Sequence, residues 1–356
     1  MLLRVSDHTA PSWNRLVETF GDRNLLQTWE WGEAKHRTAP WSVERLEFVE
    51  SGEIVGIAQV LVRRLPLLLG GMAWVNRGPL WDRNSGDEHV PAMMRLLHER
   101  YVGERGLYLR VAPTLPDSRL PGILLGAARF QNAGLPGHQA GRIDLTRSET
   151  ALRAGLRQSW RRFLVKAERQ GTQVIIGRDP EIFTRFLDAY GTILDQAAYR
   201  KSTTPDLLQA FQDALPEGSR MIVLEAVAGK KPVSWVLIAT YGETGEYLAA
   251  ASLPDGRQRN CGQLLTWAAM LHLKALDFRT LDIGGFDPHD EASGVSHFKR
   301  GTNAVAYRYC TEIDAHSSVM KRSVIRRAIA LGRTPIRIPL LAPGRAGFPT
   351  SAARDG

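Results

Sequence analysis

The sequence predicts an α/β protein with mixed sheets, built from two similar halves. The chain has 356 residues, which is the length of about two ordinary domains. A hairpin, a strand, a helix and another strand are predicted in the first half, and they return in the same order about 177 residues later. Because this repeated unit is much longer than the repeats of a solenoid, the pattern indicates an internal duplication.

The first copy begins with apolar segments at residues 43–49 and 54–62, separated by the turn Glu-Ser-Gly-Glu. This arrangement is typical of a β-hairpin. A short strand is predicted at residues 72–75, followed by apolar residues with helical spacing over 90–101. A strand at residues 107–111 completes the unit.

The second copy has the same parts at matching positions. Residues 221–227 and 232–240 form the arms of a predicted hairpin around the turn Ala-Gly-Lys-Lys. A strand follows at residues 247–251, then a helical pattern over 264–275 and a strand at 280–283. Each half is therefore expected to form an α/β unit with its own core.

The joint between the halves is predicted near residues 144–149, just before a long helix over 150–170 that Gly171 ends. We therefore expect a first half over residues 1–147 and a second half over residues 148–330. Residues 331–356 are basic and rich in proline and glycine, which predicts a disordered tail.

The net charge of +9 is concentrated in two segments. Residues 153–169 contain six basic residues and one acidic residue, and residues 315–356 contain eight and one. Such clusters indicate a partner with concentrated negative charge, and the basic chain end could touch an anionic membrane.

The two cysteines, Cys261 and Cys310, can form neither a disulfide framework nor a cluster of metal ligands. No apolar run approaches the ~18 residues that cross a membrane, and residues 1–11 lack the pattern of a signal peptide. We therefore expect a cytoplasmic protein without a metal, which the basic chain end could bring to the inner face of the membrane.

The predicted helix over residues 150–170 carries two basic faces. Arg153, Arg157 and Arg161 share one face, and Arg162, Lys166 and Arg169 share the other. A solvated surface helix would explain them, but like charges at this spacing destabilise a helix unless an anion lies nearby. A phosphodiester backbone is such an anion.

A second candidate anion site lies where Gly262 begins a predicted helix after Arg259. The pattern partly matches the pyrophosphate loop of acyl-coenzyme A N-acyltransferases, although bulky Leu264 stands where a small residue is needed. An acyl-coenzyme A-dependent N-acyltransferase of polysaccharide or metabolite tailoring is therefore one alternative function.

The densest group of polar and glycine residues spans residues 281–303. Gly284 and Gly285 follow a strand, and Phe298 and Lys299 precede another. The basic residues could simply guard an exposed sheet edge. The histidines and aspartates of this segment match no standard metal spacing, and no serine occupies a nucleophile elbow.

Four segments, taken in order, resemble the Fem family of aminoacyltransferases. They are QTWEW at residues 27–31 with Lys35, LRQSWRRFLVKAERQG at 156–171, Tyr199 with Arg200, and Gly284-Gly285 with GVSHFKRGTN at 294–303. The resemblance implies two tandem GNAT-like acyltransferase domains. It also implies transfer of an amino acid from aminoacyl-tRNA to an amine of a peptidoglycan precursor, lipid- or nucleotide-linked, or of a related acceptor. Aminoacyl-tRNA would be a co-substrate, and no other cofactor is implied.

The resemblance also implies roles for single residues. Lys299 would stabilise the oxyanion of the transfer step, and Phe298 would shape the pocket around it. Lys35 and Arg200 would hold phosphates of the precursor. The remaining expected substrate contacts are Trp31, Tyr199 and Tyr247. The expected contacts to tRNA phosphates are Arg157, Arg161, Arg162 and Lys166.

Two departures from the family pattern concern the acceptor and the donor. Thr302 and Asn303 follow Gly301 where the family usually has a Phe-Gly pair, and the long coiled-coil arm of several members is missing. No general base stands out; Glu312 and Asp314 are candidates by position alone. The sequence does not determine which amino acid, tRNA and acceptor are used, or the oligomeric state. A second alternative function is a non-catalytic module that binds RNA or an anionic surface.

Overall fold

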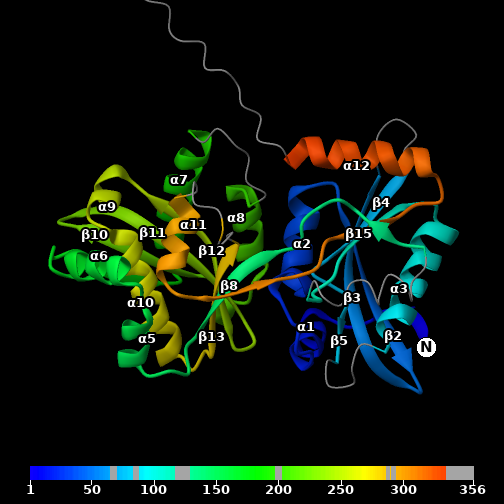
Figure 1. Ribbon diagram of the computed structural model, residues 1–356, viewed down its shortest axis with the longest axis horizontal. Helices are drawn as coiled ribbons and strands as arrows, with labels where there is room; N and C mark the ends of the chain where they lie inside the picture. The colour runs from blue at the N-terminus through cyan, green and yellow to red at the C-terminus, as the bar shows by residue number, and fades with distance from the viewer. Residues whose placement is uncertain are drawn as a thin grey trace, which may run out of the picture.

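A computed structural model describes residues 1–64, 70–82, 88–116, 129–196, 203–285, 289 and 294–333. Its two mixed sheets form neighbouring lobes (Figure 1). Among the described helices, none is long and apolar enough to span a bilayer.

The first sheet has the strand order β1-β2-β3-β4-β6-β15-β7, and β5 pairs with β3. Its strands are β1 (Leu2–Val5), β2 (Ser42–Glu50), β3 (Glu53–Arg64), β4 (Gly71–Asn76), β5 (Leu80–Trp81), β6 (Tyr108–Ala112), β7 (Gln131–Asn132) and β15 (Ile313–Ala315). Helix α3 (Val90–His98) covers one face and continues into a π-helix at Glu99–Glu104. Helices α1 (Ala10–Thr19) and α12 (Val319–Arg333) contribute to apolar clusters with the same sheet.

The second sheet has the order β14-β8-β13-β12-β11-β10-β9. Its strands are β8 (Gln139–Asp144), β9 (Gln173–Gly177), β10 (Ile222–Ala228), β11 (Lys231–Tyr241), β12 (Thr244–Ser252), β13 (Thr280–Gly285) and β14 (Val305–Arg308). One face packs against α5 (Glu149–Gly155), α6 (Gln158–Glu168) and α10 (Cys261–Ala275). The other face packs against α7 (Pro180–Asp195) and α8 (Pro205–Ala214).

The predicted duplication is visible in the strand pairing. In the first half β2, β3 and β4 pair antiparallel in succession, and β4 pairs parallel with β6. In the second half β10, β11 and β12 repeat the antiparallel pairs, and β12 pairs parallel with β13. Each parallel pair is joined by a crossover that contains a helix, α3 or α10, as parallel strands require.

The halves do not divide at the expected boundary between residues 147 and 148. Strand β8, at residues 139–144, already belongs to the second sheet, between β14 and β13. After β14 the chain returns to the first sheet, where β15 pairs with β6 and β7. The Arg322 side chain of α12 donates to buried Asp314 of β15 at 2.7 Å, which ties this returning segment to the first half. Residues 334–356, most of the expected tail, lie outside the described residues.

The expected helix over residues 150–170 is in fact two helices, α5 and α6. Leu156 and Arg157 between them have extended backbone, with ψ of 142° and 145°. The Arg157 N–H donates to the Gly301 carbonyl at 3.0 Å, so a tertiary hydrogen bond replaces the helical one. Arg153 and Arg161 are therefore not successive positions on one helix face.

A shared apolar contact joins the two lobes. Helix α2 (Trp29–Thr38) of the first half lies against α8 of the second. The Trp31 ring meets the Phe211 ring edge-on, at a centroid distance of 5.4 Å. Because one apolar cluster contains residues of both halves, their orientation is set by packing and not by a linker alone.

Candidate active site

The second sheet opens where β12 and β13 separate. These parallel strands are paired from Thr244 and Thr280 to Glu246 and Asp282, and both then continue without pairing to each other. The equivalent strands of the first half, β4 and β6, stay paired from Met72 and Tyr108 to Asn76 and Ala112. The duplicated units therefore differ at this point, because the second leaves unpaired strand ends that can receive a substrate.

Two glycines shape the open end of β13. Gly284 has a φ of +70°, and its N–H donates to the Asp282 carboxylate at 2.8 Å. A Cβ at Gly284 would lie 2.8 Å from the Tyr247 carbonyl oxygen. Both the backbone conformation and the close approach require glycine here.

Helix α11 (Gly294–Gly301) brings Phe298 and Lys299 to this opening. The Lys299 Nζ donates to the Gly285 carbonyl at 3.0 Å and lies 5.7 Å from the centroid of the Tyr247 ring. Phe298 faces inward, with its ring centroid 5.9 Å from that of Trp160 on α6. The helix thus places an apolar ring in the core and an ammonium group at the end of β13.

Tyr247 lies on β12 directly after the last residue paired with β13. Burial raises the pKa of its hydroxyl, and the Thr266 side chain on α10 is a hydrogen-bond partner. Tyr247 is therefore a neutral hydroxyl group at neutral pH. The structure brings together Lys299, Phe298 and Tyr247, three of the residues expected at the site.

An ion pair crosses between the halves beside this opening. Arg77 follows β4 of the first half in a left-handed conformation, with φ of 51°. Its Nη1 lies 3.3 Å from Oε1 of Glu246, and both side chains are largely buried. Burial raises the pKa of the Glu246 carboxyl, whereas the positive charge of Arg77 opposes that shift. The first half therefore contributes a buried charge to the point where β12 and β13 separate.

His138 lies on the same side of the junction, just before β8. Arg77 Nη2 is 3.0 Å from its Nε2. Burial, and then the positive charges of Arg77, Arg142 and Lys299, lower the pKa of His138 to about 2. The imidazole is therefore neutral across the physiological range of pH.

Two tyrosines and Arg142 complete this cluster. The Arg142 guanidinium lies 4.2 Å from the centroid of the Tyr307 ring, and it donates to the Tyr309 hydroxyl at 3.1 Å. Tyr307 donates to Asp282 at 2.6 Å. We call Arg77, His138, Arg142, Glu246, Asp282, Tyr307 and Tyr309 the junction cluster. None of these seven residues was expected at the site from the sequence; the alternation of Tyr307 and Tyr309 along one strand was the signal that could have indicated the cluster.

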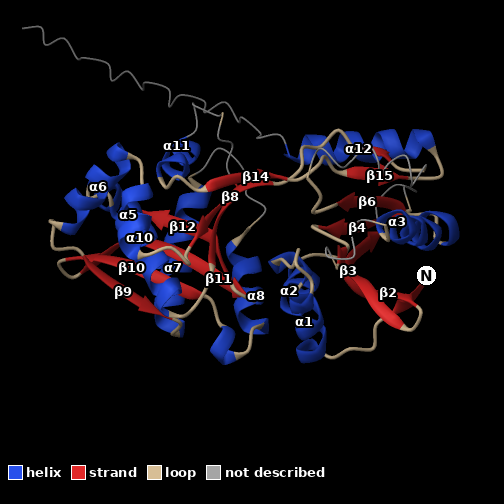
Figure 2. Ribbon diagram, turned by 60° about the horizontal axis from the view of Figure 1, so that its bottom comes forward, coloured by secondary structure: helices blue, strands red, loops and turns tan. Residues whose placement is uncertain are grey.

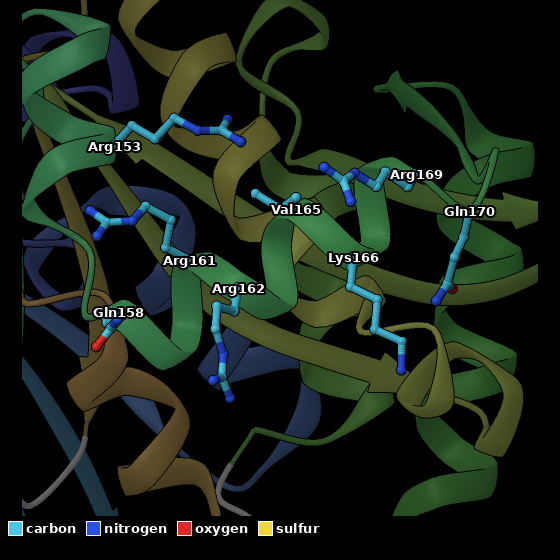
Figure 3. A pocket seen from close by; sticks show the side chains of 8 residues that line it. All are labelled: Arg153, Gln158, Arg161, Arg162, Val165, Lys166, Arg169 and Gln170. Carbon is cyan, nitrogen blue, oxygen red and sulfur yellow. The ribbon is translucent and has the colours of Figure 1, made fainter.

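A cationic groove of about 680 Å³ runs along α6 (Figure 3). Its lining residues are Arg153, Gln158, Arg161, Arg162, Val165, Lys166, Arg169 and Gln170. Arg153 is held by both oxygens of Glu168, at 2.9 and 2.6 Å. Within the described ranges, no carboxylate lies at ion-pair distance from Arg162, Lys166 or Arg169.

Arg157 does not line the groove, although it was expected among the phosphate contacts. It is exposed at the break between α5 and α6, where its backbone amide is bound to Gly301. The helix break turns it away from the positions that an unbroken helix would give it. Arg161, Arg162 and Lys166 do share the groove.

Two further expected substrate contacts, Lys35 and Trp31, lie together on α2. The Lys35 Nζ is 5.4 Å from the centroid of the Trp31 ring, and burial lowers the pKa of this lysine. Trp31 itself is buried in the contact between the halves. Tyr199 and Arg200 fall outside the described residues.

Glu312 and Asp314 are not available as general bases. Glu312 forms a buried ion pair with Arg110 of β6. Asp314 accepts hydrogen bonds from Arg322 and from the Tyr108 hydroxyl, at 2.7 and 2.8 Å. Both carboxylates lie in the first half and stabilise the returning segment. The described residues also contain no group of three possible metal ligands.

The two sheets have matching strand orders, and the parallel pair of strands opens only in the second sheet. Together these features define a tandem acyltransferase fold of the GNAT type. A family model described as an acetyltransferase (GNAT) domain matches residues 153–300, which include α6, β12, α10 and Lys299. This confirms the fold class that the sequence predicted.

The resemblance to the Fem family is confirmed by relatives and by a solved structure. Lipid II:glycine glycyltransferase of Staphylococcus aureus (strain bovine RF122 / ET3-1) is 29% identical over 97 residues, or 27% of this chain and 23% of the relative. The match thus spans under a quarter of the length of that relative. The crystal structure of FemX superposes with a TM-score of 0.78 at 16% identity, covering 92% of this chain and all of FemX. A tandem GNAT protein from the clavulanic acid biosynthesis pathway has a TM-score of 0.52 at 12% identity, covering 89% of this chain and 99% of that protein.

Proposed function

We propose that the protein transfers an amino acid from aminoacyl-tRNA to an amine of a peptidoglycan precursor or a related acceptor. The observation that carries the proposal is the Lys299 ammonium, held against the Gly285 carbonyl where β12 and β13 separate. The names of its relatives support the choice of acceptor, since they are lipid II:glycine glycyltransferases.

The chemistry is a direct attack of the acceptor amine on the ester carbonyl of aminoacyl-tRNA. A carbon–nitrogen bond forms and the carbonyl electrons move to oxygen, giving a tetrahedral oxyanion. The carbon–oxygen bond to the ribose then breaks, and the proton lost by the amine ends on the ribose oxygen. The Lys299 ammonium stabilises the oxyanion, which is the charge that develops in the transition state.

The donor side of the proposal rests on the groove along α6. Among the described residues, Arg162, Lys166 and Arg169 of this groove have no carboxylate partner. Such a row of cations favours a phosphodiester backbone, because each neutralised phosphate releases counterions. Helix α11 connects this groove with Lys299, since Gly301 accepts the Arg157 amide and Phe298 packs on Trp160. A tRNA end bound along α6 would therefore lead toward the opening.

The acceptor side is the junction between the halves. The lowered pKa of His138 beside Arg77 supports this, because the same burial and positive charges disfavour a proton on any basic group there. An amine entering the same surroundings would be favoured in its neutral, nucleophilic form. As the resemblance implies, Lys35 and Arg200 would hold the precursor's phosphates, and a lipid-linked precursor would bring the protein to the inner face of a membrane.

The coenzyme A alternative is disfavoured by the residues at the start of α10. A Cβ at Gly262 would lie 3.3 Å from the Phe298 ring, so that ring covers the place where a pyrophosphate would approach. Leu264 is part of the apolar core, and Arg259 is paired with Asp255 at 2.9 Å. The amides of Gln263 and Leu264 already donate to the Asn260 carbonyl, so they are not open for a pyrophosphate.

The test is the turnover of Lys299→Ala with charged tRNA and a muropeptide precursor. We expect kcat to fall by about 10²-fold or more, because a donor to the oxyanion is lost. Arg300→Ala removes the neighbouring cation of the same helix and serves as the matched control, for which we expect a much smaller loss. An unchanged kcat in Lys299→Ala would remove this residue from the mechanism.

The donor is tested in the same assay. Labelled aminoacyl-tRNAs are compared with coenzyme A thioesters, and release of label that requires both one tRNA and the acceptor supports the proposal. Transfer from a thioester alone would replace it with the coenzyme A alternative. Salt-dependent RNA binding without any transfer would indicate a non-catalytic binding protein.

A further inference from the structure

Helix α12 presents apolar side chains on both of its sides. On the inner side, Ile325 packs with Trp41, Leu61, Met72 and Tyr108 of the first half. On the outer side, Val319, Met320 and Val324 have relative exposures of 74%, 76% and 47%. Large apolar side chains at such exposure, gathered on one short helix, indicate a surface that another partner covers.

The cations of α12 divide between the same two sides. Arg322 and Arg326 point inward: Arg322 donates to Asp314 at 2.7 Å, and Arg326 donates to the Ala133 carbonyl at 3.0 Å. Lys321 and Arg327 flank the outer apolar residues, and Arg327 is exposed. Among the described residues, neither has a carboxylate at ion-pair distance. The outer side therefore combines exposed apolar groups with unneutralised positive charge.

This combination fits an anionic bilayer better than RNA. Apolar side chains of a surface helix enter the boundary between headgroups and acyl chains, while lysine and arginine meet anionic headgroups. RNA would neutralise the cations but would leave Met320 and Val324 in water. The chain beyond α12 adds three arginines and one aspartate over residues 334–356, so the positive charge continues in the sequence.

The position of α12 agrees with a membrane-bound acceptor. Figure 2 shows α12 and α11 along the same upper edge of the molecule, although they belong to different halves. A bilayer that touches α12 would therefore face the side on which α11 carries Lys299. A lipid-linked substrate could reach the opening without the protein leaving the surface.

We propose that the outer side of α12, formed by Val319, Met320, Val324 and the flanking Lys321 and Arg327, docks on an anionic membrane surface. The inference extends the proposed function by naming the surface that faces a lipid-linked acceptor. Its test needs neither tRNA nor acceptor. Membrane docking can therefore be disproved while the proposed transfer reaction stands, and the transfer reaction can be disproved while membrane docking stands.

The experiment measures co-sedimentation of the full chain with vesicles at low salt. Vesicles of equal parts phosphatidylglycerol and phosphatidylcholine are compared with vesicles of phosphatidylcholine alone. We expect binding to the anionic vesicles and at least about tenfold weaker binding to the neutral ones, because the flanking cations lose their partners. Equal binding to both vesicles, or to neither, would overturn the proposal.

The variant Met320→Asp/Val324→Asp tests the outer side of α12, because it removes two apolar groups and adds two negative charges there. Both side chains are exposed, so the melting temperature should stay close to that of the parent chain, while vesicle affinity should fall at least about tenfold. Leu276→Asp/Ile175→Asp is the control with the same change in net charge, since Leu276 and Ile175 are exposed apolar residues of the other half, at 47% and 45%. It should bind vesicles like the parent chain, and an equal loss in both variants would contradict the proposal.

A truncation distinguishes α12 from the residues that follow it. Deletion of residues 334–356 should weaken binding only partly, because α12 keeps its apolar contact. If the deletion abolishes vesicle binding while Met320→Asp/Val324→Asp does not, the docking surface is the chain end and not α12. Loss of RNA affinity in Met320→Asp/Val324→Asp, with vesicle binding unchanged, would likewise reject a membrane surface.

Discussion

The protonation of His138 is determined by residues from both halves of the chain. Its ring packs against Tyr307 and Tyr309, at centroid distances of 6.0 and 6.2 Å, and Arg77 approaches its edge. The first half supplies Arg77 and the second supplies Arg142 and Lys299, so cations of both halves surround one imidazole. A proton on that ring would be buried among like charges.

The pH dependence of stability tests this environment. In the folded chain the pKa of His138 is about 2, against an ordinary value of 6.5 in the unfolded chain. Below pH 6.5 the unfolded state therefore binds a proton that the folded state does not, and stability falls as the pH falls. The contribution is at most about 1.4 kcal/mol per pH unit, and solvent screening reduces it.

The matched variant is His138→Gln, which keeps a polar partner for Arg77 but does not titrate. Between about pH 7 and pH 5, the parent chain should lose about 1 kcal/mol more of its unfolding free energy than the variant. Denaturant unfolding at both pH values gives this difference. Identical pH dependence in the two proteins would show that His138 is not held neutral by the fold.

At the scale of elements, the break between α5 and α6 decides what the basic segment can bind. An unbroken helix would spread its six cations over two opposite faces. The break instead exposes Arg157 beside Gly301 and leaves Arg162, Lys166 and Arg169 in one groove. The same hydrogen bond fixes α6 to the end of α11, which carries Lys299.

Charge reversal on α6 is expected to weaken tRNA binding. The variant Arg162→Glu/Lys166→Glu removes two cations of the groove and adds two like charges facing the phosphates. Affinity for tRNA should fall at least about tenfold at low salt, and the slope of log affinity against log salt should flatten by about two. Filter binding over a salt series measures both quantities.

A control with the same change in net charge separates the groove from general electrostatics. Arg15→Glu/Arg95→Glu reverses two exposed arginines on α1 and α3 of the first half. This variant should lose much less affinity and keep the salt slope of the parent chain. If both variants lose the same amount, the protein attracts RNA through its net charge and not through α6.

At the scale of the whole molecule, the chain crosses between the sheets twice. It leaves the first sheet after β7, enters the second at β8, and returns to the first between β14 and β15. The strands of the second sheet are therefore continuous in sequence, whereas the first half needs residues from both sides of the second.

Fragments of similar length test this division. A fragment of residues 136–310 contains every strand of the second sheet, whereas a fragment of residues 148–330 lacks β8. Without β8, β14 has no partner and β13 gains an unpaired edge. We expect the first fragment to unfold cooperatively and to resist protease, and the second to aggregate or to be digested; equal resistance of both would contradict the strand order.

The sequence by itself determined the duplicated α/β architecture. Hairpins, crossover helices and parallel strands of both halves were predicted close to their observed bounds, because apolar periodicity and turn residues act over a few positions. The motif around Phe298 and Lys299 was also identified, since its residues are adjacent in the chain. The confirmed resemblance to the Fem family followed from these local patterns.

Only the tertiary structure decided how the parts meet. The boundary at residues 147–148 and the single helix over 150–170 were wrong, because β8 pairs with β13 and β14, and Gly301 accepts the Arg157 amide. The junction cluster was missed for the same reason, since Arg77, His138, Glu246 and Tyr307 are far apart in sequence. Their proximity, and the charges that it creates, arise from contacts between strands and between halves, which no local sequence pattern records.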